Sequence, residues 1–436
     1  MNETVNTHKK MEELDRMSIP YEAIPPSEWK RNAYDSNNSV SIETLRIFYK
    51  CTRDLEKVIE EQEGDEKEVE EYIINLLSLI LTQRLHLIVY HDRWLYFFNG
   101  KYFEPCPSKQ ELQCILRELC EAAAYLWKRF SVHDKTVKRL LSHVQQNAVK
   151  VDYPPDISKY VVFENGVLNL DTLELEDFTP QKFFTSMIHA DWLAENKACP
   201  EYEKVINTYT NHEAPLNKRI NEVLGVCLTN DMVKKLFCFL GVTNSGKTFL
   251  LSFLLRLFNN SATVTMQPND LGRQFAPSMV YGKSLCCCMD MDSAPLNTKA
   301  TAFLKGISGA DMLSAEFKGE NGSVPFQSRA HIINASNYDI TTKMPDAAFD
   351  MRKLVIPFKY RLTDNAEPFE VLMDKLEREK AAIVRKLILA YKALKDNHYE
   401  FSDSEEGESY DSYVPPTAVS RSTSKSLDFF FTACYV

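Results

Sequence analysis

The chain has 436 residues, of which 44% are hydrophobic and 26% are charged, and its formal net charge at pH 7 is −10. This length suffices for two domains with cores of their own, and no apolar run reaches the ~20 residues of a membrane span, which argues against a membrane protein. The acidic total argues against a surface that coats duplex DNA, although a narrow basic channel stays compatible with it.

The N-terminal stretch MNETVNTHKK is polar and lacks the apolar region of a secretory signal. The chain has 11 cysteines, and none of them forms a C-x-x-C pair. Cys286, Cys287 and Cys288 fall in an apolar stretch, where we expect buried and reduced thiols. These features together predict a cytoplasmic protein.

Residues 1–40 hold several prolines and few apolar groups, which predicts a flexible N-terminal arm. Residues 41–200 are predicted to form a mainly helical domain with β-hairpins. Apolar residues at helical spacing predict helices within 41–90, 111–130 and 135–149. The pairs Asn99-Gly100 and Asn165-Gly166 lie between strand-like runs, and each predicts the type I′ turn of a hairpin.

A different pattern begins near residue 200. The segment 200–228 has helical spacing, and from residue 235 short apolar runs alternate with helical or loop segments. This alternation predicts an α/β domain over residues 201–398, ending in a long amphipathic helix at 370–396. The acidic and serine-rich stretch after Tyr399 predicts a linker, so residues 399–436 are expected to be an acidic linker and a C-terminal segment.

Near the end of the chain, Leu427, Phe430, Phe431 and Cys434 have helical spacing behind a Ser/Thr cap. An exposed aromatic cluster favours aggregation, so this short helix is expected to dock on the chain itself or on a neighbouring copy. The alternative is that it begins a further domain.

Residues 241–248 fit the phosphate-binding pattern G-x-x-x-x-G-K-[ST] in full. They lie between a predicted buried strand and a predicted apolar helix, as the chemistry requires. The glycines let the backbone wrap around phosphate oxygens, the lysine reaches the β- and γ-phosphates, and the threonine hydroxyl ligates Mg²⁺. The pattern therefore predicts that ATP and Mg²⁺ bind at Gly241, Val242, Thr243, Asn244, Ser245, Gly246, Lys247 and Thr248.

Such a loop needs an acidic partner for Mg²⁺ at the end of a neighbouring strand. Asp290 and Asp292 follow the apolar run 285–289. Asp290 is predicted to hold the metal through water, and Asp292 to orient or polarise the attacking water. Asn337, at the tip of the next apolar run, is predicted to lie beside the γ-phosphate, with Asn334 as the second candidate.

Arg352 directly precedes the apolar run 353–358 and is predicted to reach a neighbouring subunit's nucleotide as an arginine finger. The pair Asn321-Gly322 predicts another hairpin turn, with Phe317 and Lys318 near its tip. One aromatic ring and one cation can grip a base and the backbone of a nucleic acid. The structural alternatives are a surface arginine at a strand start and an ordinary hairpin with a solvated lysine.

The residues from about 94 to 358 resemble superfamily 3 helicases, especially those of phage and plasmid primase–helicases and of large DNA viruses. In that family a phosphate-binding loop, an acidic strand end, a lysine-bearing pore hairpin, an asparagine-ended strand and an arginine occur in this order. Here the order is followed by Lys247, Asp290 and Asp292, Lys318, Asn337 and Arg352. The runs FENGVLNL at 163–170, FFT at 183–185 and CPEY at 199–202 are similar to the domain that precedes the helicase.

The resemblance implies an AAA+-type ATPase core and a hexameric ring with ATP at the subunit interfaces. It also implies translocation on single-stranded DNA and unwinding of forked DNA during replication of a virus, phage or mobile element, in the host cytoplasm if the chain is viral. This sequence departs from the family in its acidic motif, where Met291 separates two aspartates, and in having Met351-Arg352 in place of two arginines. The stretch before residue 94 is too short and too helical for a primase domain, so a separate primase is expected.

A second interpretation comes from a different functional class. A phosphate-binding loop also occurs in assembly or regulatory proteins, which use ATP to form rings and recruit partners without unwinding. ATP hydrolysis that is stimulated by nucleic acid distinguishes the two, because a motor shows it and an assembly switch need not.

Overall fold

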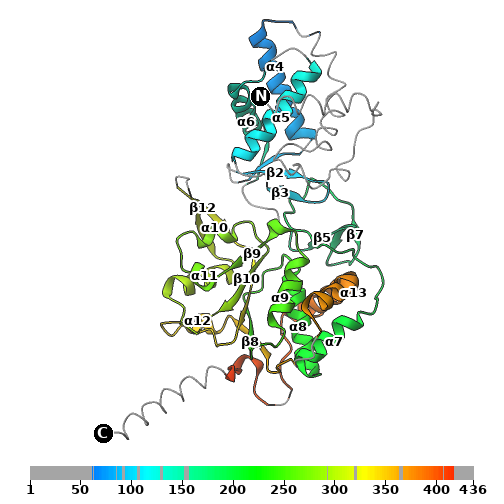
Figure 1. Cartoon of the computed structure of the whole chain (residues 1–436), viewed down its shortest axis with the longest axis vertical. Helices are drawn as coiled ribbons and strands as arrows, with labels where there is room; N and C mark the ends of the chain where they lie inside the picture. Colours follow the sequence, from blue (N-terminus) through cyan, green and yellow to red (C-terminus); the bar gives the residue numbers. More distant parts are fainter. Residues whose placement is uncertain are drawn as a thin grey trace, which may run out of the picture. The chain divides into compact units, whose positions relative to one another are not determined.

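The computed structural model describes residues 61–416 and is shown in Figure 1. The residues not described within this range are 62, 85, 91–93, 106–108, 128–130, 152–156, 292, 319–321, 363–366 and 406. The predicted arm at 1–40 and the predicted C-terminal helix lie outside the described residues. The chain divides into two compact units, which are residues 1–155 with 178–185, and residues 156–177 with 186–436.

The core of the first unit is formed by helices, and their bounds are α4 (Glu66–Leu79), the π-helical turn η3 (Ile80–Arg84), α5 (Lys109–Trp127) and α6 (Asp134–Asn147). Helix α4 begins at Asp65, whose carboxylate accepts hydrogen bonds from the N–H groups of Lys67 and Glu68 at 3.0 and 2.9 Å. The side chain of Glu68 accepts one in return, which completes a capping box. Apolar side chains at helical spacing, such as Ile73 and Leu77, are fully buried in this core.

A four-stranded sheet in the order β3-β2-β1-β4 completes the first unit, with bounds β1 (Ile88–Tyr90), β2 (Trp94–Phe98), β3 (Phe103–Pro105) and β4 (Val149–Val151). Strands β2 and β3 form the predicted hairpin, but Phe98 pairs with Phe103, so the loop has more residues than the predicted two-residue turn. The carboxamide oxygen of Asn99 accepts hydrogen bonds from the N–H groups of Lys101 and Tyr102, both at 3.0 Å. These hydrogen bonds of the Asn99 side chain hold the longer loop, which is present in place of the predicted type I′ turn.

The second unit begins with a three-stranded antiparallel sheet of β5 (Tyr160–Phe163), β6 (Gly166–Asn169) and β7 (Leu175–Glu176). The second predicted hairpin is present, but Phe163 pairs with Gly166, so Glu164 and Asn165 form its loop rather than Asn165 and Gly166. The side chain of Asn165 bonds to the backbone N–H and C=O of Trp192 at 2.8 and 3.0 Å. The asparagine therefore fixes the following segment.

The centre of the second unit is a parallel five-stranded sheet in the order β14-β8-β13-β10-β9. Its strands are β8 (Leu236–Gly241), β9 (Thr263–Met266), β10 (Leu285–Met291), β13 (His331–Ser336) and β14 (Lys353–Phe358). These are the apolar runs that the sequence predicted as strands. Strand β13 lies between the loop-bearing strand β8 and the acid-bearing strand β10, and β14 is an edge strand.

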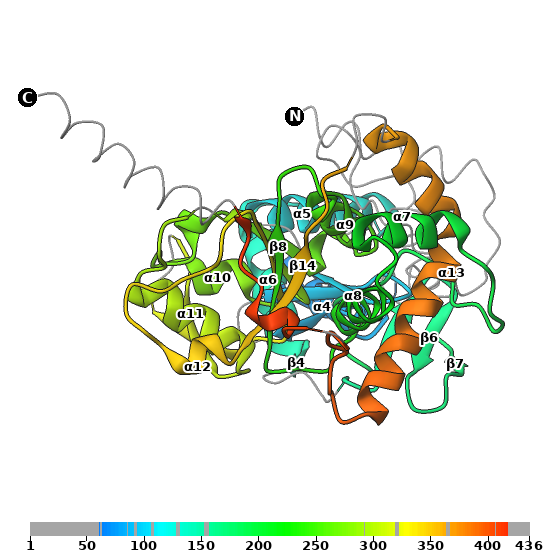
Figure 2. The ribbon, with the colours of Figure 1, turned by 90° about the horizontal axis from the view of Figure 1, so that it is seen from below.

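Helices cover both faces of this sheet (Figure 2). One face packs against α7 (Pro200–Thr210), α8 (Ala214–Cys227), α9 (Lys247–Arg256) and α13 (Phe369–Asp396). The other packs against α10 (Ala276–Val280), α11 (Thr298–Ser308), α12 (Ala347–Asp350) and the hairpin of β11 (Met312–Glu316) and β12 (Ser323–Gln327). Three short 3₁₀ turns are η4 (Asn260–Ala262), η5 (Pro268–Asp270) and η6 (Tyr410–Ser412). Successive residues of β8 enter opposite cores, as Phe237 and Cys238 do, so the strand is buried on both faces.

The division into units differs from the predicted boundary between residues 200 and 201. Phe163, Leu168 and Trp192 share one buried core with α7, α8, α9 and α13, which draws 156–177 and 186–200 into the second unit. The stretch after Tyr399, predicted as an acidic linker, packs against this unit as far as it is described. Tyr410 within it is 1% exposed, and the neighbouring Asp411 accepts hydrogen bonds from Arg219 of α8 and from the N–H of Val355 in β14.

Candidate functional site

The loop that connects β8 to α9 has the shape that its glycines allow. Gly246 is the N-cap of α9 with φ +92°, and Asn244 has φ +55°. A Cβ atom on Gly246 would lie 2.3 Å from the buried ring of Tyr209, and one on Gly241 would lie 2.0 Å from the carbonyl oxygen of Phe358. Only glycine fits at these two positions, because real Cβ atoms do not approach other atoms so closely.

The loop curls around the side chain of Lys247, which is 7% exposed. Its Nζ donates hydrogen bonds to the carbonyl oxygens of Gly241 and Val242, at 3.1 and 2.6 Å, and to Ser245 Oγ at 3.1 Å. Thr248, in the first turn of α9, is exposed. The loop therefore combines a fixed ammonium, the N-terminus of α9 and a hydroxyl, which are the groups that bind phosphate and its metal ion.

A cavity of about 810 Å³ adjoins this loop. Its lining includes the carboxyl ends of two strands, with Met291 of β10 and Ser336 of β13, followed by Asn337 and Tyr338. Helices α7 and α13 also line it, with apolar side chains such as Tyr209 and Leu372. A cavity of this size suits a nucleotide-sized ligand.

Asn337 and Asn334 have different surroundings. Asn337 lines the cavity beside Ser336, whose Oγ donates a hydrogen bond to the carbonyl oxygen of Met291 at 2.9 Å. Asn334 is fully buried in the middle of β13, paired with Cys238 of β8 and Cys288 of β10. The geometry thus gives Asn337, and not Asn334, access to a ligand on the loop.

The two predicted acids belong to the end of β10 and the residues directly after it. The backbone of Asp290 belongs to the carboxyl end of β10, on the same sheet edge as the phosphate-binding loop, and its side chain is outside the described part. Asp292 is outside the described residues altogether. Their roles stay predictions.

Arg352 lies at the amino ends of the parallel strands, opposite the carboxyl ends that carry the phosphate-binding loop. Its carbonyl oxygen accepts a hydrogen bond from the N–H of Leu236 at 2.7 Å, at the start of β8, whereas the phosphate-binding loop follows the end of β8. A six-residue strand spans roughly 16–20 Å, so this arginine cannot reach the loop of its own chain. Its Nη1 donates a hydrogen bond to the carbonyl oxygen of Ala348 at 2.9 Å, at the surface.

The hairpin of β11 and β12 presents its two predicted residues unequally. Phe317 is half-buried and packs edge-on against Tyr281, with 5.6 Å between the ring centroids. Tyr281 also contacts Phe326 of β12, with 5.0 Å between the ring centroids. Phe317 therefore packs in one aromatic cluster with Tyr281 and Phe326. Lys318 is exposed, and the next three residues are not described.

Several cavity residues had no signal in the sequence. The ring of Tyr209 packs against Gly246 of the loop and edge-on against Phe249, which in turn contacts Phe369. Glu367 lines the cavity and accepts hydrogen bonds from Lys375 at 2.8 and 2.9 Å. These bonds outweigh the effect of desolvation and lower the pKa of Glu367, so the carboxylate is charged at neutral pH. A helical repeat of apolar residues could have indicated that Tyr209 and Phe249 are buried, but not which cavity they line.

The cysteines that were predicted to be buried are buried. Cys286, Cys287 and Cys288 are fully enclosed in β10, and burial raises the pKa of the Cys287 thiol well above its ordinary value. No helix in the part of the chain that the structure describes is long and apolar enough to cross a lipid bilayer.

Comparison with known proteins gives two family matches. Residues 78–211 match a family described as D5 N terminal like, and residues 239–352 match a family of unknown function, DUF5906. Each match covers less than half of the chain. No curated protein matches the chain.

Solved structures that are similar to this chain include apo structures of the NrS-1 C-terminal region, at 13–14% sequence identity and a TM-score of 0.48. The similarity covers 75–76% of this chain and 74–76% of those chains. Of these findings, the D5-type match supports the predicted relationship to the primase–helicases of phages and viruses.

Proposed function

We propose that this protein is an ATP-hydrolysing DNA helicase of superfamily 3, with an AAA+-type ATPase core in its second unit. The observation that carries the proposal is the convergence on one cavity of Lys247 and Thr248 with Asn337, from the loop after β8 and the carboxyl end of β13. A loop of this kind, at the carboxyl edge of a parallel sheet covered by helices on both faces, is the usual place of a nucleotide site.

The donor groups fit ATP with Mg²⁺. The loop N–H groups and Lys247 would bind the phosphates, and Thr248 and Asp290 would hold Mg²⁺, which would supply positive charge beside them. Asp292 would orient the attacking water, and Asn337 would lie beside the γ-phosphate. The apolar part of the cavity lining, with Val205 and Leu372, would take the base.

The position of Arg352 supports a ring. Because this arginine is at the far edge of the sheet from its own loop, it can act only on a nucleotide bound to a neighbouring copy. A guanidinium supplied in this way stabilises the charge of the transition state. We propose a hexamer with ATP at the subunit interfaces.

Contact with single-stranded DNA is assigned to the hairpin of β11 and β12. Lys318 is exposed at its tip and can pair with a phosphate. Phe317 packs against Tyr281, so its contribution is to hold the hairpin rather than to stack on a base. The D5-type match is consistent with a role in DNA replication, where a separate primase would supply primers.

A second candidate is a P-loop assembly or regulatory protein that uses ATP for ring formation and partner recruitment. The packing of Phe317 favours it, since this half-buried ring leaves less of the hairpin for gripping DNA. The experiment that separates the two candidates measures ATP hydrolysis with and without single-stranded DNA, and strand displacement on forked DNA. A helicase shows both stimulation and displacement, whereas an assembly protein hydrolyses or binds ATP with neither.

A further inference from the structure

Strand β14 has one free edge, because it is the end strand of the parallel sheet. The carbonyl oxygens of Arg352 and Phe358 accept hydrogen bonds from the N–H groups of Leu236 and Val242, on the side of β8, at 2.7 and 3.1 Å. Backbone groups alternate along a strand, so those of Val355 and Pro357 face the free edge. Such an edge would pair with another chain unless it is covered.

Two side chains cover this edge at Val355. The N–H of Val355 donates a hydrogen bond to Asp411 Oδ1 at 2.8 Å, and its carbonyl oxygen accepts one from Arg219 Nε at 2.9 Å. A carboxylate and a guanidinium thus take the places of a neighbouring strand's carbonyl and amide. The next edge position is Pro357, which has no N–H to offer.

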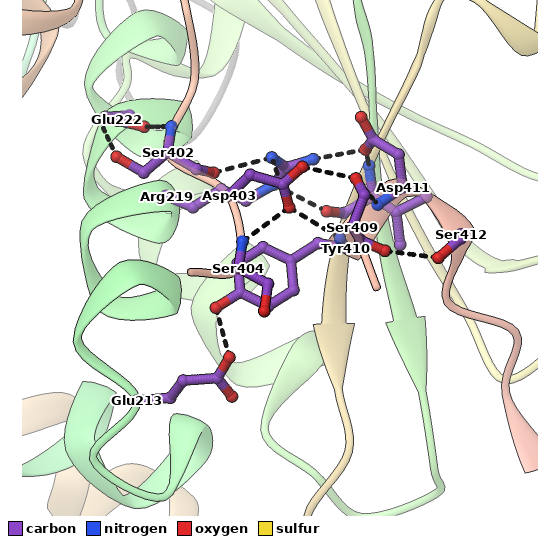
Figure 3. A network of polar contacts seen from close by, with 11 residues as sticks. Glu213, Arg219, Glu222, Ser402, Asp403, Ser404, Ser409, Tyr410, Asp411 and Ser412 are labelled. Atoms are coloured by element: carbon purple, nitrogen blue, oxygen red, sulfur yellow. Dashed lines mark hydrogen bonds and ion pairs between the residues drawn. The ribbon is translucent and has the colours of Figure 1, made fainter. Parts of the chain in front are cut away.

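Arg219, on α8, joins the edge strand to the segment that follows α13 (Figure 3). It is 1% exposed, it forms an ion pair with Asp411, and its Nη1 donates a hydrogen bond to the carbonyl oxygen of Ser402 at 2.8 Å. The guanidinium also lies 5.5 Å from the ring centroid of Tyr410. A buried arginine requires such partners, because loss of one leaves an unpaired charge away from water.

Other contacts fix the same segment, residues 402–405 and 407–413, which we call the latch. Glu222 of α8 is 2% exposed and accepts hydrogen bonds from the N–H and the hydroxyl of Ser402, both at 2.8 Å. The hydroxyl of Tyr410 donates a hydrogen bond to Glu213 (Figure 3). Lys359, directly after β14, lies over the ring of Tyr410 at 5.3 Å. The latch therefore contacts α8, Val355 in the middle of β14, and Lys359 directly after β14.

Strand β14, whose outer edge the latch covers, also packs directly against the phosphate-binding loop. The carbonyl oxygen of Phe358 lies so close to Gly241 that no Cβ atom fits between them, and it accepts a hydrogen bond from the N–H of Val242. Past the strand, the N–H of Leu362 donates a hydrogen bond to the carbonyl oxygen of Asn244 at 2.8 Å. A shift of β14 would therefore alter the shape of the loop.

We propose that the latch holds β14 against the phosphate-binding loop, so that opening the latch loosens the loop and slows nucleotide turnover at this site. Arg219 and Asp411 are positioning residues, since they act through Val355 and not on the nucleotide. The part of the proposal that concerns turnover rests on the proposed function. The part that concerns the loop does not.

The test compares Asp411→Ala with Glu408→Ala in the full chain. Glu408 is an exposed acid of the same latch, and it is used as the matched control. Hydrogen exchange is followed at Val355, at Val242 and at Ile333, a fully buried residue of the interior strand β13. In Asp411→Ala we expect exchange at Val355 and Val242 to become about tenfold faster, as loss of one hydrogen bond predicts, with Ile333 unchanged and ATP turnover reduced.

If Asp411→Ala also accelerates exchange at Ile333, the milder variant Asp411→Asn is used instead. Its amide oxygen can still accept from the N–H of Val355, but the ion pair with Arg219 is lost, which weakens the attachment of the latch. Exchange at Val355 is then expected to rise severalfold relative to Glu408→Ala. Equal exchange at Val355 in the Asp411 and Glu408 variants would overturn the latch. Faster exchange at Val355 with no change at Val242 would overturn its link to the loop. Absence of ATP hydrolysis in the unmodified protein would count against the proposed function alone, because the exchange at Val242 still decides the inference.

Discussion

The phosphate-binding loop and the latch both contact β14, and they are built in different ways. The loop uses consecutive residues, 241–248, and its shape depends on backbone conformation and on glycines that leave no room for a side chain. The latch depends on side chains from distant parts of the chain, such as Arg219 and Asp411. A site made of neighbouring residues leaves a pattern in the sequence, whereas a site made of long-range polar contacts does not.

The largest effect is expected at Arg352, at the end of β14 farthest from the loop. Arg352→Ala should lower ATP turnover by roughly 10³-fold, as for other arginine fingers, and leave nucleotide affinity nearly unchanged. Steady-state hydrolysis and nucleotide titration measure the two quantities. Arg329→Ala is the control, since Arg329 precedes β13 at the same edge of the sheet.

Mixing two inactive variants tests whether Arg352 acts on a neighbouring copy. Rings that combine Arg352→Ala with Asp290→Asn contain interfaces with one intact arginine and one intact metal site, so part of the activity should return. Confirmed mixed rings that stay inactive at every ratio would rule out action on a neighbouring copy.

A pair of glycine substitutions compares the two regions directly. Gly246 in the loop and Gly407 in the latch both have positive φ, +92° and +97°, but only Gly246 has a ring within Cβ contact distance. Gly246→Ala should cost roughly 3–5 kcal/mol, from backbone strain and overpacking together, whereas Gly407→Ala should cost about 1 kcal/mol, from strain alone. Denaturant unfolding of both variants measures the difference, and equal losses would mean that Tyr209 moves aside.

Lys318 contacts neither region, and it isolates DNA binding from nucleotide chemistry. Lys318→Ala should keep the stability and the basal ATP turnover of the unmodified protein, because the side chain is exposed on the hairpin. It should lose stimulation by single-stranded DNA and strand displacement. Unchanged DNA binding and stimulation would leave the hairpin with a structural role only.

The smallest effect concerns pH and belongs to the latch. Burial raises the pKa of Asp403, but hydrogen bonds from Ser409, Tyr410 and Ser404 and the charge of Arg219 outweigh this, so the pKa is lower than that of an ordinary aspartate. A carboxyl group with a lowered pKa stabilises the fold above its unfolded pKa, and this stability is lost as the pH falls through the folded value. Asp403→Asn should therefore lower Tm at pH 7, and the difference should shrink below about pH 4. A difference that is independent of pH would show that the charge of Asp403 does not matter.

The strands of the parallel sheet and the loop could be predicted because each rests on neighbouring residues. A five- or six-residue apolar run predicts a buried strand, and the spacing of Gly241, Gly246 and Lys247 predicts the loop. The order of the strands could not be predicted in this way, since nothing local places β13 between β8 and β10. The separation of Arg352 from the loop of its own chain follows from the parallel pairing of β14 with β8, which is likewise not a local property of the sequence.

The latch was predicted as a linker because its residues are acidic and serine-rich, which is typical of solvated segments. Two features could have indicated otherwise. Tyr410 and Tyr413 are aromatic residues in a hydrophilic stretch, and Arg219 lies on a helix face whose neighbours Leu216, Ile220 and Val223 are buried. A charged residue on an apolar face needs a partner, but the sequence does not say that the partner lies 192 residues away.

The central claim is that the loop at 241–248 hydrolyses ATP in the service of DNA unwinding. The most direct test measures ATP hydrolysis by the full chain with and without single-stranded DNA, beside Lys247→Ala. We predict that DNA stimulates the unmodified protein and that the folded variant loses hydrolysis by roughly 10²-fold or more, since a preorganised charge at the phosphates is removed. Near-normal hydrolysis by a correctly folded Lys247→Ala variant would contradict the account.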